Sequence, residues 1–305
     1  MWGNRLTEFR LIDPTEIEEA AALSLVVALR RDARPAEVAE YVANATTSVI
    51  DLANQTVAVD GRRLVGTLLF VPIGAGTVTL GAPSILDSSE KTAAGLVVRT
   101  VELCRLRGDR TLQFIAEKEQ SADAFVACGF QLLATLLCLE RYPRTGDDVA
   151  STGRFSHQTF SAESSEDFAR TIRRTFEGTL DCKRLPRSEE LDRDVLAIYR
   201  SPTAFDPGLW FLARDGEQIV GCLLLSRCPE RGCFEISYVG VVPECRGKGF
   251  GAELVRRGIA ECAARNRNWP LRLAVDRENS PAVAIYHRLG FRSMGTKSVY
   301  VRILA

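Results

Sequence analysis

At 305 residues the chain exceeds the length of one ordinary domain, so two domains of similar size are expected. Hydrophobic residues make up 46% and charged residues 26% of the sequence, which is typical of a globular protein with a substantial core. Lys plus Arg and Asp plus Glu both number 39, and this balance argues against a nucleic-acid partner, which would favour a basic excess.

Cysteine and histidine usage bears on the compartment and on metal binding. The nine cysteines are scattered without a CxxC pair, and several stand among apolar neighbours, as reduced core thiols do. With only two histidines, His157 and His287, no metal site is expected. The charged N-terminus lacks the apolar core of a signal peptide, and no stretch approaches the roughly 18 apolar residues of a membrane span. These features predict a cytoplasmic protein without membrane contact.

The first predicted domain covers residues 1–141. Apolar runs rich in β-branched residues, separated by turns such as Asp60-Gly61, predict strands, and apolar positions at helical spacing predict a long helix. In chain order the expected elements are strands over 56–59, 64–71 and 77–80, a helix over 90–106, a strand over 111–116, a short helix that ends at Gly129-Phe130, and a strand over 132–140.

A polar segment over residues 142–158, with one Pro and two Gly, is predicted to link this domain to a second one over residues 159–305. The two halves repeat the same order of elements without repeating their residues. The sequence therefore predicts an α/β (α+β) fold of two related domains, each a mixed, mostly antiparallel sheet flanked by helices. The expected elements of the second domain are strands over 210–213, 219–225 and 234–242, a helix after Gly251, a strand over 271–275, a helix over 280–289 that ends at Gly290, and a strand over 299–304.

The segment from Val241 to Gly251, VVPECRGKGFG, joins a predicted strand to a predicted helix. Pro243 ends the strand because it lacks an N–H, and the glycines let the backbone approach a bulky ligand. Free amides at the start of the helix, with the helix dipole, attract an anion. Arg246 and Lys248 add positive charge. The segment is therefore predicted to bind a phosphate or a diphosphate.

Two other phosphate-binding loops fit this segment poorly. A Walker loop requires Gly-Lys-Ser/Thr, which is absent from it. A dinucleotide-binding loop lies early in a βαβ unit, with an acidic residue about 20 positions further on. Here the loop lies late in the domain and follows strands that are predicted to be antiparallel.

Residues 241–251, read as V-V-P-x-x-R-x-x-G-x-G, resemble the acetyl-CoA-binding signature of the GNAT superfamily of N-acetyltransferases. Residues 279–291, read as N-x-x-A-x-x-x-Y-x-x-x-G-F, resemble the second half of that signature. The resemblance implies that the fourth and fifth strands of the domain splay apart around the pantetheine arm of acetyl-CoA. The resemblance also implies that acetyl-CoA is bound by a set of residues from both motifs: Val239, Gly240, Val241, Val242, Arg246, Gly247, Lys248, Gly249, Phe250, Gly251, Ala252, Asn279 and Tyr286.

Direct attack of an amine on a thioester requires a base for the amine and an acid for the leaving thiolate. Tyr286 is the predicted acid, although a core aromatic is the alternative reading of this position. Alignment of the two halves on Gly-Phe sets Phe125 opposite Tyr286, so packing there does not require a hydroxyl. The resemblance favours Glu235 as the base, acting through water, while a solvent-facing strand glutamate is an equally good reading.

Other candidates for the base are weaker. Ser237 and Tyr238 lie beside Glu235 on the same predicted strand. His287 follows Tyr286 directly on a predicted helix and should therefore point to a different face.

The first half lacks a loop of this kind, since residues 83–90 contain neither glycine nor a cationic side chain. The sequence thus predicts an N-acyltransferase with one active and one degenerate domain. It would move the acetyl group of acetyl-CoA to a primary amine of a small molecule, a peptide N-terminus or a lysine. We expect segments 176–187 and 201–208 to form the acceptor side. The alternative is a CoA-binding sensor or a partner-binding pseudoenzyme of the same fold.

Overall fold

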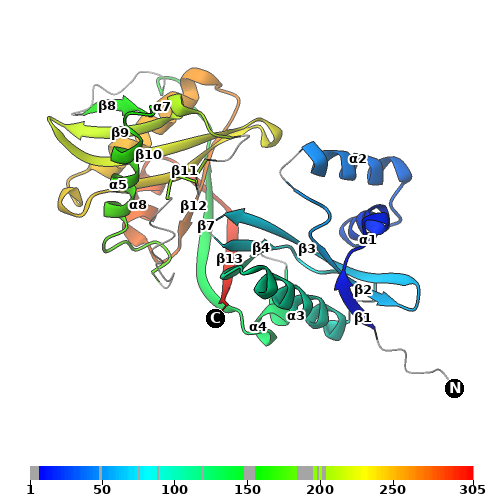
Figure 1. The fold of residues 1–305 in the computed structure, drawn as a ribbon. Coiled ribbons are helices and arrows are strands. Elements are labelled where there is room, and N and C mark those ends of the chain that lie inside the picture. The colour runs from blue at the N-terminus through cyan, green and yellow to red at the C-terminus, as the bar shows by residue number, and fades with distance from the viewer. Residues whose placement is uncertain are drawn as a thin grey trace. The chain divides into compact units, whose positions relative to one another are not determined.

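The computed structural model is shown in Figure 1. The chain divides into two compact units, residues 1–133 with 298–305 and residues 134–297. Parts of the predicted linker and of the expected acceptor segments lie outside the described residues. The described residues are 7–47, 50–74, 76–87, 89–117, 120–147, 155–183, 195–197, 199–200 and 204–304.

The first unit contains a mixed sheet with strands in the order β1-β2-β3-β4-β6, and the short β5 pairs with β3. All neighbours in it are antiparallel except β4 and β6. Its elements are β1 (Glu8–Leu11), η1 (Pro14–Glu16), α1 (Ile17–Leu29), α2 (Pro35–Thr47), β2 (Gln55–Asp60), β3 (Arg63–Gly74), β4 (Thr77–Leu80), β5 (Ser84–Ile85), α3 (Glu90–Arg107), β6 (Thr111–Glu117), α4 (Asp123–Ala127) and the start of β7 (Gln131–Arg141).

The second unit contains strands in the order β7-β12-β11-β10-β9-β8, antiparallel except for β11 and β12. The predicted fold class, mixed and mostly antiparallel sheets flanked by helices, is confirmed. Its further elements are β8 (Ser156–Thr159), α5 (Ser165–Thr175), η2 (Pro207–Leu209), β9 (Trp210–Asp215), β10 (Gln218–Cys228), η3 (Pro229–Arg231), β11 (Cys233–Val241), η4 (Pro243–Cys245), α7 (Phe250–Arg265), β12 (Leu271–Asp276), α8 (Ser280–Arg288) and the first half of β13 (Arg292–Ile303).

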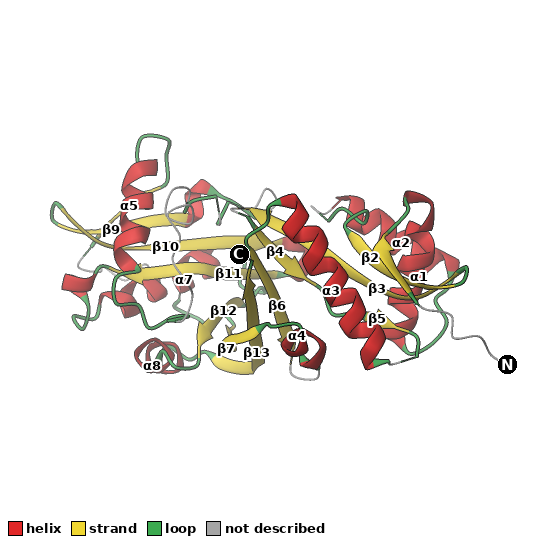
Figure 2. Cartoon of the chain, turned by 60° about the horizontal axis from the view of Figure 1, so that its bottom comes forward, coloured by secondary structure: helices red, strands yellow, loops and turns green. Residues whose placement is uncertain are grey.

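Both sheets bury strand residues on two faces. In β2, Ala58 packs with the α3 side of the core, whereas Val57 packs with the α1 side. Figure 2 shows α3 lying across the strands of this unit. In β10, Leu223 belongs to the core beneath α7, and Leu224 belongs to the core beneath α5. Since side chains alternate along a strand, a nearly continuous apolar run is what two covered faces require.

The last strands of the two halves of the chain, β7 and β13, are exchanged between the two units. Most of β7, which follows the first half in sequence, pairs along β12, from Leu271 opposite Arg141 to Asp276 opposite Leu136. The end of β13 instead joins the first unit, where the Leu304 N–H donates to the Arg110 carbonyl at 2.7 Å. The units therefore differ from the predicted domains at both closing strands. The predicted strand over 132–140 matches β7, whereas β13 begins at Arg292, seven residues before the predicted strand over 299–304.

The repeated short helix confirms the internal similarity. In the first unit the Phe130 N–H donates to the Phe125 carbonyl across Gly129. In the second, the Phe291 N–H donates to the Tyr286 carbonyl across Gly290 in the same way. The positive φ angles of the two glycines, 82° and 85°, close both helices with the same left-handed turn. Phe125 and Tyr286 thus occupy equivalent positions, as the alignment on Gly-Phe predicts.

Buried thiols and phenols make the second unit sensitive to alkali. Burial raises the pKa of Cys222 to about 12 and raises the pKa of Tyr238 above its ordinary value. A raised folded-state pKa means that stability is complete below the unfolded pKa and is lost as the pH rises through the folded one. We expect the free energy of unfolding to fall by roughly 1 kcal/mol per pH unit for Cys222 above about pH 8.5, and for Tyr238 only above about pH 10. Urea unfolding between pH 7 and 10 measures this slope.

The matched variant for this prediction is Cys222→Ala, which removes one such group. Its unfolding free energy should decline less steeply with pH than that of the wild type. Equal slopes in the two proteins would contradict the assignment to Cys222.

No helix among the described residues is long and apolar enough to span a membrane.

Candidate active site

The strands β11 and β12 pair only at one end. Their parallel ladder consists of Phe234 opposite Leu271 and Glu235 opposite Arg272, and beyond these pairs the described residues of the two strands form no ladder. In the first unit, by contrast, all four residues of β4 pair with β6. The second unit alone therefore has an unpaired strand edge of this kind among its parallel strands, as the resemblance to the acetyltransferases implied.

A bulge in β11 changes which residues face each helix. Leu224 pairs with Tyr238 and Leu225 pairs with Ile236, so Ser237 is the extra residue. Ile236 therefore faces the core under α7, and Tyr238, two positions on, faces the core under α5. The bulge thus brings the Tyr238 ring onto the same face as α5, at the end of the strand where β12 has turned away.

The glycine loop ends in an uncapped helix start. Gly247 and Gly249 have φ angles of 75° and 90°, and a Cβ added at either would meet nothing within 4 Å. Gly249 is the N-cap of α7 and provides no side-chain hydrogen bond. The first amides of α7 therefore have no partner from the helix or from the cap, and the space beside the two glycines is open. Such an end suits a diphosphate.

The equivalent helix start in the first unit is closed. The Ser89 side chain caps α3 by accepting from the Thr92 N–H at 3.2 Å. The Asp87 carboxylate accepts from the Ser89 N–H at 3.0 Å. Carboxylate and hydroxyl oxygens thus occupy the place where an anion would bind, which agrees with the prediction that the first half lacks the loop.

Arg246 is tied to protein carbonyls. Its guanidinium donates to Val241 O at 3.1 Å, to Gly178 O at 3.2 Å and to Thr175 O at 2.8 Å. The last two carbonyls lie at the C-terminal end of α5, where a cation is favoured. Gly240 allows this close approach, because a Cβ there would lie 2.7 Å from the Thr175 side chain. The Arg246 side chain thus joins the glycine loop to the end of α5.

We expect Arg246→Ala to lower the free energy of unfolding by about 1–3 kcal/mol, because three carbonyls lose a charged donor. The same change should raise the Kd for acetyl-CoA about tenfold, since the loop loses its anchor. Thermal unfolding and calorimetry measure the two effects. Arg256 is an exposed arginine on α7, so Arg256→Ala is the matched control. Equal behaviour of the two variants would contradict the anchoring role.

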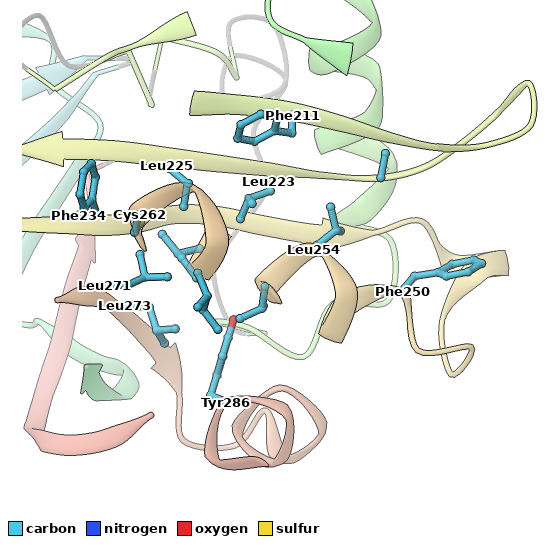
Figure 3. Packing of buried hydrophobic residues seen from close by; sticks show 14 of the residues in the cluster. Phe211, Leu223, Leu225, Phe234, Phe250, Leu254, Cys262, Leu271, Leu273 and Tyr286 are labelled. Atoms are coloured by element: carbon cyan, nitrogen blue, oxygen red, sulfur yellow. The ribbon is translucent and has the colours of Figure 1, made fainter. Parts of the chain in front are cut away.

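Tyr286 is buried and lies between α8 and α7. Its ring makes an edge contact with Phe291, with ring centroids 5.6 Å apart, and 6% of the residue is exposed. Figure 3 shows its side chain extending from α8 into the buried cluster that includes Leu254. Burial, and secondarily the negative charge of Asp181, raise the pKa of the Tyr286 phenol. The phenol therefore keeps its proton at neutral pH, as an acid must.

Glu235 lies at the paired end of β11, opposite Arg272. Its carboxylate accepts from Arg231 at 2.5 Å in an ion pair. Its role as the base remains a prediction.

The other two polar side chains of β11 are also hydrogen-bonded. The Ser237 hydroxyl lies 2.6 Å from the Ser226 hydroxyl, and the Tyr238 hydroxyl lies 2.6 Å from the Thr175 hydroxyl. Because the Thr175 hydroxyl donates to the Ile172 carbonyl, Tyr238 must be the donor in its pair. His287 is exposed, unlike its buried neighbour Tyr286.

Asn279 caps α8 and reaches a residue that the two signature motifs do not include. Its side-chain oxygen accepts from the Ala282 N–H at 3.3 Å. The side chain also hydrogen-bonds to Asp181, which lies beyond the end of α5. Asp181 belongs to the expected acceptor segment 176–187, but no spacing in the sequence singles it out, because its partners lie about 95 residues further along the chain.

The fold and the site resemble those of the GNAT acetyltransferases, and comparisons with known proteins agree with this resemblance. Residues 172–291 match the model of the acetyltransferase (GNAT) family. The match lies within the second unit and covers less than half of the chain.

Curated relatives and solved structures point the same way. Over 96 residues the chain is 38% identical to the mycothiol acetyltransferase of Streptomyces bingchenggensis, covering 32% of this chain and 31% of that protein. Over 145 residues it is 31% identical to that of Clavibacter michiganensis subsp. michiganensis, covering 47% and 44%. The matches thus span less than half the length of these relatives.

Two solved structures match nearly the whole chain in fold. A GCN5-related N-acetyltransferase from Sphaerobacter thermophilus gives a TM-score of 0.65 at 17% identity and covers 99% of this chain and 97% of its own. A tandem GNAT protein from the clavulanic acid biosynthesis pathway gives 0.59 at 16% identity and covers 98% of each chain. The predicted tandem arrangement of two GNAT-like domains is therefore confirmed at the level of fold.

Proposed function

We propose that this chain transfers the acetyl group of acetyl-CoA to a primary amine, by direct attack of the amine nitrogen on the thioester carbon. The observation that carries the proposal is the uncapped start of α7 beside a strand edge that lacks a partner. A helix start of this kind suits a diphosphate. An unpaired strand edge suits an extended arm that carries amides, as pantetheine does.

The proposed binding site uses backbone more than side chains. The edge of β11 from Val239 to Val242 would hold the pantetheine arm, and the amides from Gly247 to Ala252 would hold the diphosphate. Lys248 is exposed and supplies charge near the phosphates. Arg246 acts by holding the loop in place, and Asn279 by capping the helix that carries Tyr286.

In the proposed reaction a bond forms between the amine nitrogen and the thioester carbon, and the carbon–sulfur bond breaks. The amine loses a proton, which we assign to Glu235 through a water molecule. The departing thiolate gains a proton, which we assign to the Tyr286 hydroxyl. Glu235 must exchange its hydrogen bond with Arg231 for the water before it can act. Metal chemistry forms no part of this proposal.

The proposed acceptor is a primary amine on a small molecule, with a peptide N-terminus or a lysine as the alternative. The name of the curated relatives, mycothiol acetyltransferase, supports the small-molecule acceptor. We propose a cytoplasmic location, since all nine cysteines are free thiols and reduced cysteines are typical of that compartment.

Calorimetry with acetyl-CoA, followed by a screen of thiol release, tests the proposed function. One acetyl-CoA should bind per chain, because the equivalent helix start of the first unit is capped by Ser89. The screen covers polyamines, amino sugars, amino acids and peptides, and at least one should release thiol at a rate proportional to enzyme. Failure to bind acetyl-CoA would overturn the proposal, and binding without release for any amine would favour a sensor.

A further inference from the structure

Asp181 is held at the end of β12 that does not pair with β11. One carboxylate oxygen accepts from the Asp276 N–H at 3.1 Å, and the Asn279 side chain donates a second hydrogen bond to the carboxylate. Because the Asn279 oxygen already accepts from Ala282, its amide nitrogen must be the donor to Asp181. The carboxylate is thus fixed to the strand and the helix that form one side of the open edge.

The residue next to Asp181 is held in a demanding conformation. Cys182 has a φ angle of 45°, in the left-handed region that non-glycine residues seldom adopt. Its N–H donates to the Asp276 carboxylate at 2.9 Å, and that carboxylate also accepts from the Glu278 N–H at 2.9 Å. Asp276 is therefore satisfied by backbone donors, and it locks the turn that presents Asp181.

The negative charge of Asp181 affects the pKa of three tyrosine side chains from three parts of the chain. It contributes to raising the pKa of Tyr286 on α8, of Tyr238 on β11 and of Tyr199. Burial is the larger cause in each case. The hydrogen bond from Asn279 ties Asp181 to the start of α8, the helix that carries Tyr286. The phenol that we assign to the leaving thiolate thus lies on the helix whose cap holds Asp181.

Asp181 lacks a cationic partner within the described part of the chain, although its surroundings disfavour a lone negative charge. Desolvation and the charge of Asp276 raise the pKa of its carboxyl group. The residue as a whole nevertheless remains exposed to solvent. An accessible carboxylate with a fixed position, few favourable neighbours and no paired cation attracts a ligand that carries positive charge.

We propose that Asp181 binds the ammonium group of the acceptor and so sets the specificity of this site for cationic amines. The inference rests on the proposed acetyl transfer and names the contact that holds its second substrate. A primary ammonium has three N–H donors, one of which would bond to the Asp181 carboxylate. The bound ammonium would release one proton to solvent before attack, and the resulting amine would then lose its second proton to Glu235, as in the proposed reaction.

Binding of amines to the CoA-loaded protein tests the proposal without requiring turnover. The probes are butylamine, putrescine and glucosamine, with 1-butanol as a neutral counterpart, and saturation-transfer NMR measures their binding. The wild type should bind at least one amine and should bind 1-butanol much more weakly. Asp181→Asn, which keeps an acceptor for the Asp276 N–H, should raise the Kd for that amine at least tenfold.

Glu177 supplies the matched control, because it is an exposed carboxylate in the same segment, and Glu177→Gln should bind amines as the wild type does. Thermal unfolding confirms that each variant is folded, and Asp181→Glu should recover part of the affinity. Equal amine affinity in the wild type and Asp181→Asn, or no amine binding by the wild type, would overturn the proposal. Asp181-dependent binding without thiol release from acetyl-CoA would support it while refuting the proposed transfer.

Discussion

Replacement of Tyr286 by phenylalanine is expected to lower kcat for acetyl transfer by about a hundredfold, the lower range for loss of a general acid. The Kd for acetyl-CoA should change little, because the ring keeps its contact with Phe291 and only the hydroxyl is lost. The equivalent residue of the first unit, Phe125, shows that this position accommodates a phenylalanine. Steady-state thiol release with a responsive amine, together with calorimetry, measures both quantities.

The control for Tyr286 is Tyr300→Phe, which removes a hydroxyl from the first unit, where the Tyr300 ring stacks near Phe114. That variant should keep the wild-type rate. An undiminished rate in Tyr286→Phe with every active amine would disprove its assignment as the acid. A parallel loss of rate in both variants would point to general destabilisation rather than to proton transfer.

Replacement of Gly249 by glutamate is expected to raise the Kd for acetyl-CoA a hundredfold or more. The added side chain would enter the open space before α7, where the diphosphate is proposed to lie. It would bring a negative charge there and displace hydrogen bonds worth roughly 1.5–3 kcal/mol each. The φ angle of 90° adds strain in any non-glycine residue. Calorimetry with acetyl-CoA measures the loss.

Two variants separate the charge from the strain. Gly249→Ala carries the strain alone and should raise the Kd by tenfold or less. Gly74→Glu is the matched control, since Gly74 has a φ angle of 97° and equally open space but lies in the hairpin between β3 and β4. Wild-type affinity in Gly249→Glu would refute the proposed diphosphate site. Comparable losses in the two glutamate variants would show that strain accounts for the effect.

Much of the second unit could be predicted from its sequence. The apolar runs predict β10 and β11 to within a few residues, and the glycine loop marks the start of α7. Gly290 marks the end of α8, where its left-handed backbone closes the helix. These signals are local, because a turn, a helix cap or a strand that is buried on both faces requires particular residue types within a short stretch of chain.

The exchange of closing strands could not be predicted in the same way. Residues 132–140 and 299–304 both read as strands, and both are strands. Their apolar patterns suit the edge of either sheet. The local sequence therefore does not indicate that β7 pairs with β12 or that Leu304 belongs to the first unit. Strand pairing is a choice among partners far apart in sequence, which depends on the fit of whole faces.

The hydrogen-bond partners of charged side chains could not be predicted from the local sequence pattern either. Arg246 stands in the signature, and a cation beside a phosphate loop suggests a contact with the phosphate, yet its guanidinium bonds to Thr175 and Gly178. Asp181 stands in no motif, yet it meets Asp276 and the cap of α8. A long or exposed side chain has many possible partners, and only the folded backbone selects among them.

The sequence by itself predicts the class of protein. Two motifs in order, an uncapped glycine loop before a helix and a helix closed by Gly-Phe, are local devices that need no tertiary information. The tertiary structure decided which strands complete each unit, that β11 and β12 pair at one end only, and that the Asp181 carboxylate lies at the open end. These features depend on contacts between residues distant in the chain, which leave no periodicity in the sequence to read.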